Sequence, residues 1–323
     1  MQPTLPHNRE IATIGTPTQS RDVTAAGLLF AISNIAISAL QPVITRYAML
    51  SIEPLEFCAL SVMIAAGCSV TMLICTGEIR LLLELCYLPR LVAISIAGTV
   101  ATTLALAYGL RRIDAVAGVI LLASEPIYSL VLATVFLHER PSRRQVIATS
   151  VIVAAIGYIF GAGSSFSPLG ASLLILFTPL FWQCSHVLSL KVMPPLTPRL
   201  ITGARYVYAA IALLAILLGV GHTSLDTLAT PGLLIPAALT ALVYFTGSFT
   251  WYGAISRLSL AWTTALVIPA VPLVSMVFAM ILLGERPSAR ELAGLALAVM
   301  SMAALVLGSD ARRSADSGSA IYE

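Results

Sequence analysis

The strongest constraint on this chain is a four-residue motif that occurs twice, 146 residues apart. The two copies read Glu139-Arg140-Pro141-Ser142 and Glu285-Arg286-Pro287-Ser288. Each copy closes one long apolar segment and opens the next. Upstream residues align at the same offset, Pro126 with Pro272 among them. An internal repeat of this length predicts two structurally equivalent halves.

The composition indicates that both halves lie in a lipid bilayer. Of the 323 residues, 58% are hydrophobic and only 10% are charged, and the mean hydropathy is +0.94. Soluble domains carry about 25% charged residues. The net charge of +3 is small and forms no basic face, so we expect no nucleic-acid partner. The five cysteines and four histidines are scattered, and we therefore expect no metal site and no cofactor.

Charge-free runs predict ten membrane spans, because one span needs about 20 apolar residues. The runs are 23–45, 57–77, 91–110, 145–190, 206–225, 227–256, 258–284 and 292–309. The run 145–190 is long enough for two helices, and segment 115–137 is a further span that contains Glu125. We expect an all-α polytopic protein with two five-helix repeats. Its predicted parts are a disordered tail at 1–22, repeats at 23–163 and 164–308, and a second tail at 309–323.

The basic residues predict the orientation of the spans. With both termini inside, twelve of the eighteen Lys and Arg residues fall on the cytoplasmic side and five on the outer side. This bias favours cytoplasmic termini, in the plasma membrane or the inner membrane of a bacterium. Five spans per repeat then place the second repeat upside down relative to the first. Inverted repeats of this kind form the two gates of many secondary transporters.

The repeated motif also has a purely structural interpretation. Ser142 with Gln145, and Ser288 with Glu291, have the spacing of a capping box that starts the fifth and tenth helices. We favour this role for the motif over direct contact with a substrate.

These features resemble the drug/metabolite transporter superfamily, and specifically its EamA-type permeases. The resemblance rests on the stretches from Glu125-Pro126 to Ser142 and from Pro272 to Ser288, and it covers roughly residues 24–308. It implies a secondary transporter of small polar or amphipathic metabolites such as amino acids, often an exporter. It also points to Arg205, seven residues after Pro198. The corresponding position of the first repeat is Ser61, so symmetry does not support a role for Arg205.

Glu125 and the two aligned prolines are the first candidate functional residues. Glu125 lies 12 residues before Leu137, which places it about 18 Å along the helix and near the bilayer midplane. A carboxylate there is costly and is expected to face a wet cavity or carry a proton. Our hypothesis is proton coupling or cation binding, and the alternative is a structural hydrogen bond. Pro126 and Pro272 predict paired bends that let the gates move, or passive packing.

The second group of candidates lies on the first, sixth and seventh helices. Arg205 could hold a carboxylate or phosphate in its planar fork, or extend to the membrane surface. We expect four further residues to line a cavity, with hydrogen bonding between helices as the alternative: Asn34, Trp182, Gln183 and His186.

Small residues along the fifth and tenth helices allow close packing, either with each other or across a homodimer. Three competing functions remain at this stage. They are a passive channel, a flippase for a lipid-linked substrate, and an intramembrane enzyme, although no convergent catalytic set is visible in the sequence.

Overall fold

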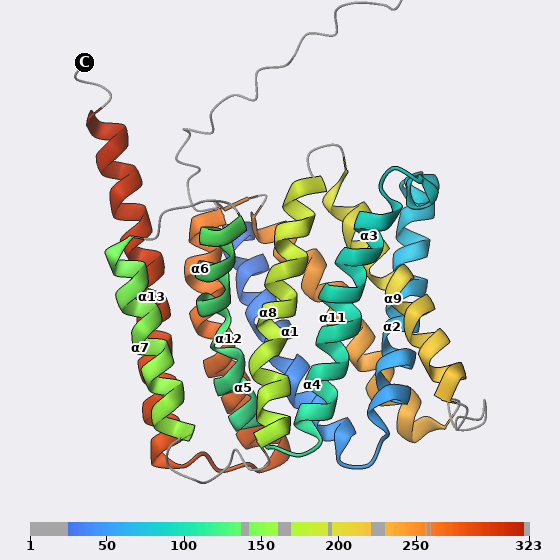
Figure 1. Ribbon diagram of the computed structural model, residues 1–323, viewed down its shortest axis with the longest axis horizontal. Helices are drawn as coiled ribbons and strands as arrows, with labels where there is room; N and C mark the ends of the chain where they lie inside the picture. Colours follow the sequence, from blue (N-terminus) through green and yellow to red (C-terminus); the bar gives the residue numbers. More distant parts are fainter. Residues whose placement is uncertain are drawn as a thin grey trace, which may run out of the picture.

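The computed structural model describes residues 25–136, 142–160, 169–192, 196–220, 230–255, 257–258 and 260–319, and within them it is entirely helical (Figure 1). The first half contains α1 (Ala25–Met49), α2 (Pro54–Cys75), η1 (Ile79–Leu83), α3 (Leu88–Ser95), η2 (Ile96–Ala101), α4 (Thr102–Leu110), α5 (Ala115–Leu122), α6 (Glu125–Phe136) and α7 (Arg143–Phe160). The second half contains α8 (Leu169–Val192), α9 (Pro198–Val220), α11 (Pro231–Ile255), α12 (Leu260–Leu283) and α13 (Ala289–Ser319). The expected tail at 1–22 lies outside the described residues.

Ten long helical segments are present in this part of the chain, as the sequence predicts. Two of them are interrupted: α3, η2 and α4 form one segment, and α5 and α6 form another. Eight of the ten are long and apolar enough to cross a membrane, and α7 and α13 are the other two. Large apolar side chains such as Leu29, Leu218 and Ile281 are more than 60% exposed. An exposed apolar surface on so many helices is the surface that lipid covers.

The helix contacts repeat between the halves. α1 of the first half packs against α11 and α12 of the second half. Its counterpart α8 packs against α4 and α6 of the first half. The contact of α2 with α11 is matched by that of α9 with α3. Two pairs, α2 with α9 and α7 with α13, connect equivalent helices. This pattern is what a two-fold exchange of two five-helix units produces, so the halves interlock rather than sit side by side.

The two halves also run in opposite directions. Figure 1 shows that α1 begins and α13 ends at one end of the bundle, where α6 ends and α7 begins. The connection from α12 to α13 lies at the other end. Ser142, just before α7, and Ser288, just before α13, therefore lie at opposite ends of the bundle, as an inverted repeat requires. Both expected capping boxes are confirmed: Ser142 pairs with Gln145, and Ser288 pairs with Glu291, with reciprocal bonds of 2.7 and 3.3 Å in each case.

The helices that carry the small residues pack against each other. α7 and α13 lie side by side at one edge of the bundle (Figure 1). Ile152, Ile156, Leu295 and Met302 join a buried cluster that also contains residues of α5. Packing within one chain therefore uses these faces, and a homodimer through them stays a prediction. The helix of α13 continues to Ser319, beyond residue 308, where we expected a tail to begin.

The fourth span is broken where the sequence places Glu125 and Pro126. α5 ends at Leu122, Ala123 and Ser124 form a turn, and α6 begins at Glu125. Proline cannot donate its backbone bond and its ring clashes with the preceding turn, which accounts for a break at this point. Pro272 behaves differently, because it lies with Pro269 inside α12, which is one continuous helix. A break in the helix is therefore seen at Pro126 and not at Pro272, and the expected pair of bends that lets the gates move stays a prediction.

Candidate functional site

Glu125 begins the second half of the broken span. Its Oε1 accepts a hydrogen bond of 2.8 Å from Nε2 of Gln183 on α8. The N-terminus of a helix carries a partial positive charge that stabilises a carboxylate. Among the described residues, no Lys, Arg or His side chain lies within ion-pair distance of Glu125. Within the described part of the chain, this carboxylate is thus held by one amide and a half-helix end.

Arg205 does not extend to the membrane surface. Its Nη2 donates a 2.7 Å hydrogen bond to the carbonyl oxygen of Gly98. Gly98 lies near the middle of the Leu88–Leu110 span, in the π-helical turn η2. A second bond joins α9 to the third span, since the hydroxyl of Ser95, the last residue of α3, donates to the backbone carbonyl of Arg205 at 2.7 Å. The alternative in which Arg205 reaches the surface is therefore corrected, because the guanidinium bonds to a carbonyl in the membrane interior.

Gly98 permits this approach because it has no side chain. A Cβ at Gly98 would lie 2.2 Å from Oγ of Ser185 and 2.9 Å from Nη2 of Arg205. Ser185 itself donates a 3.0 Å hydrogen bond to the carbonyl of Ile94 on α3. π-helical turns often occur at functional sites. Here the turn brings α8 and α9 into direct contact with the third span.

α8 connects the two charged groups. Gln183 and His186 are three residues apart, so they lie on one face of the helix. Gln183 contacts Glu125, and His186 lies close enough to Arg205 for their charges to interact. Glu125 and His186 keep accessible surface although both lie deep among protein atoms. Trp182, on the same turn of α8, is half-buried, and the expectation that these residues line a cavity stays a prediction.

Asn34 takes the alternative role that the sequence left open. Its side chain is only 3% exposed, and its Nδ2 donates to the carbonyl of Gly247 at 2.8 Å and to Oγ1 of Thr250 at 3.0 Å. Both acceptors lie on α11. The buried amide therefore joins α1 to α11, which favours hydrogen bonding between helices as its role.

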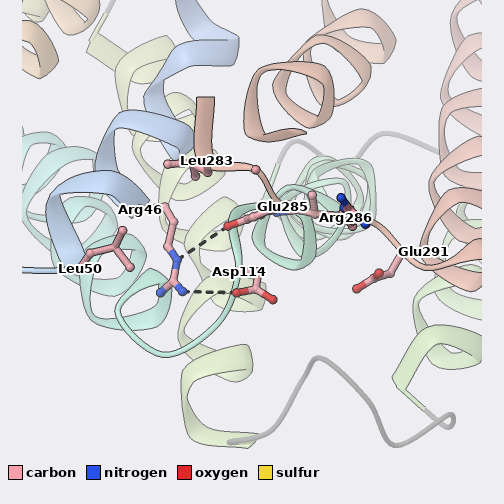
Figure 2. Close-up of a pocket in the computed structure, with 9 residues that line it drawn as sticks. Arg46, Leu50, Asp114, Leu283, Glu285, Arg286 and Glu291 are labelled. Carbon is pink, nitrogen blue, oxygen red and sulfur yellow. Dashed lines mark hydrogen bonds and ion pairs between the residues drawn. The ribbon is translucent and has the colours of Figure 1, made fainter. Parts of the chain in front are cut away.

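A second polar cluster lies at the end of the bundle where α12 turns into α13 (Figure 2). Glu285 of the second motif accepts hydrogen bonds of 2.9 Å from the backbone N–H groups of Ala115 and Val116, the first residues of α5. Arg46 of α1 lies 3.8 Å from Oε1 of Glu285 and 3.3 Å from Oδ1 of Asp114. Its Nη1 also donates to the Leu110 carbonyl at 2.7 Å.

This cluster surrounds a cavity of about 360 Å³ that Arg286 and Glu291 also line. The contact between Glu285 and α5 was not predicted from the sequence, because the motif was assigned to the start of α13. Asp114 immediately before an apolar helix was the available signal for a helix start. The equivalent motif residues Glu139, Arg140 and Pro141 lie outside the described residues.

Comparisons with known proteins agree with this arrangement. Residues 25–161 and 169–307 each match the EamA-like transporter family. An uncharacterized protein of Pseudomonas aeruginosa is 30% identical over 214 residues, which cover 66% of this chain and 72% of that protein. A solved crystal structure superposes with a TM-score of 0.62 over 87% of this chain and 96% of that one; at 16% identity this likeness shows the fold alone. The family matches cover both halves of the ten-helix bundle, and the protein therefore belongs to the EamA-like transporter family, a family of transporters rather than enzymes.

Proposed function

We propose that the protein is a secondary-active exporter of small, amino-acid-like or other polar or amphipathic metabolites, coupled to protons through Glu125. Membership of the family supports membrane transport of small solutes. The inverted halves support alternating access, in which two equivalent ends of the bundle open in turn around a central site. The basic residues support a plasma-membrane orientation with both termini in the cytoplasm.

The observation that carries the coupling proposal is the environment of Glu125. A broken transmembrane helix is a common site for substrate and ion binding in transporters. Glu125 lies at this break with Gln183 as its hydrogen-bond partner and without an ion-pair partner among the described residues. Proton release would leave a carboxylate that the end of α6 stabilises, and protonation would remove the cost of a charge inside the membrane.

Arg205 and His186 supply the other side of the proposed site. Among the described residues no carboxylate lies within ion-pair distance of Arg205. One nitrogen of its fork bonds to Gly98, and we propose that the rest of the fork binds an anionic group of the solute. Gln183 and Trp182, on the same turn of α8, complete the proposed solute contacts.

The test is solute uptake by inside-out vesicles, with a panel of amino acids and small metabolites and with or without an imposed pH gradient. We expect saturable uptake that the gradient stimulates. Glu125→Gln keeps the hydrogen-bonding shape but cannot exchange a proton, so this variant should lose the stimulation. Glu84→Gln is the matched control, because Glu84 is exposed between η1 and α3. Saturable uptake with an unchanged pH response in Glu125→Gln would remove Glu125 from the coupling mechanism.

A further inference from the structure

The contact between Glu285 and α5 joins the two repeats at one end of the bundle. Glu285 belongs to the segment between α12 and α13, whereas Ala115 and Val116 begin α5 of the first repeat. Arg46 adds an ion pair from α1. The side chains of Glu285 and Arg46 are only 13% and 16% exposed, so water screens this ion pair weakly. The first and second repeats cannot separate at this end while these contacts are in place.

The helix that Glu285 caps already has a capping residue of its own. Asp114 occupies the N-cap position of α5 with extended backbone angles (φ −69°, ψ 157°), yet its side chain makes no capping hydrogen bond. Aspartate is among the best N-cap residues because its carboxylate accepts a bond from the N–H of the second or third residue of the helix. Here Glu285 occupies the N–H of Val116, the second residue of the helix, together with that of Ala115, and Arg46 lies 3.3 Å from the Asp114 carboxylate.

The segment that carries Glu285 has the geometry of a hinge. Gly284 follows the end of α12 with φ +68, a left-handed conformation that favours glycine, and no atom would contact a side chain there. Residues 284–288 form no helix between α12 and α13. A change at this short segment can therefore move Glu285 without unwinding either helix.

From these observations we propose that Glu285 and Asp114 are exchangeable caps of α5, and that their exchange closes and opens this end of the transporter. In the closed state Glu285 caps α5 and Arg46 holds Asp114. In the open state Glu285 withdraws with the second repeat, and Asp114 takes over the N–H group of Val116, the second residue of the helix, which an N-cap carboxylate can reach. Both states keep the N–H group of Val116 bonded, so opening avoids the cost of leaving this group without an acceptor. This inference rests on the proposed alternating access.

The experiment measures access to the proposed solute site on α8 rather than transport. The five native cysteines are replaced by alanine, His186→Cys is introduced as the reporter, and a membrane-impermeant maleimide is applied separately to each membrane face. Trp182→Cys serves as a second reporter if the first does not fold. Size-exclusion profiles confirm that each variant is folded.

The exchange predicts opposite effects for the two carboxylates. Glu285→Gln weakens the closed state, so labelling from the α12–α13 face should accelerate about tenfold, a change typical of one lost charged hydrogen bond. Arg46→Ala should act in the same direction. Asp114→Ala removes the replacement cap, so it should slow labelling from that face. Arg286→Ala is the matched control, since Arg286 lines the same cavity without an ion pair among the described residues.

A purely structural role gives a different result. Labelling that changes in the same direction in Glu285→Gln and Asp114→Ala, or in neither, would overturn the exchange of caps. The readout needs no substrate. Opposite labelling changes in a protein that transports no solute of the panel would therefore support the exchange while contradicting the proposed transport function.

Discussion

Replacing Gly98 by alanine tests the contact that positions Arg205. The added Cβ would lie 2.2 Å from Oγ and 2.6 Å from Cβ of Ser185, and 2.9 Å from Nη2 of Arg205. Ordinary contacts of a Cβ begin at 3.4 Å, so α8 must move away from η2 by about 1 Å. Overpacking of this kind typically costs about 1–3 kcal/mol.

The assay is thermal unfolding of the purified protein in detergent, followed by intrinsic fluorescence. Gly67→Ala is the matched control, because no atom lies within 4 Å of a Cβ at that position in α2. Alanine favours a helix over glycine by about 1 kcal/mol, so the control should be neutral or more stable. The difference between the two variants then reports the steric clash. Gly98→Ala should melt about 2 °C or more below the control.

A second substitution identifies the source of the clash. Ser185→Gly removes the two nearest atoms, and the penalty of Gly98→Ala should become smaller in that background than in the wild type. Such a coupling is the signature of residues in direct contact. If Gly98→Ala is as stable as Gly67→Ala, the close approach of α8 and η2 is contradicted, and with it the position of Arg205.

Three further predictions follow from other contacts. Arg205→Lys keeps one donor for Gly98 but loses the fork, so we expect a higher KM than wild type, and Arg205→Ala should be worse still; equal transport by both variants would contradict the fork. Asn34→Leu removes two hydrogen bonds to α11, each worth about 0.5–1.5 kcal/mol, so it should lower thermal stability, whereas an unchanged melting temperature would contradict the packing role. Ser288→Ala removes a confirmed helix cap and should cost about 1 kcal/mol, and a melting temperature equal to that of wild type would contradict it.

Features with a local sequence signature were predicted correctly. The repeat of Glu-Arg-Pro-Ser and the charge-free runs led to ten long helices in two inverted halves. Ser142 and Ser288 were recognised as caps because a capping box depends only on residues three apart. Pro126 was recognised as a disruption because proline acts on its own helix.

Features that depend on contacts between distant segments could not be predicted in the same way. Glu285 caps a helix that begins 170 residues earlier in the chain, and nothing in the local sequence of either segment encodes that pairing. Asn34 and Arg205 were recognised as costly polar residues, but their acceptors on α11 and η2 depend on which helices meet. The differing effects of Pro126 and Pro272 show that equivalent sequence positions can have different backbones.

Substrate counterflow tests most directly the proposal that the protein is a carrier, which exposes its solute site to one side of the membrane at a time. Proteoliposomes loaded with an excess of unlabelled solute are diluted into a trace of the same labelled solute. A carrier exchanges the two and accumulates label transiently above its equilibrium level, so we predict such an overshoot for at least one amino-acid-like solute. Flux that rises linearly with concentration, without an overshoot for any solute that crosses, would show a channel and contradict alternating access.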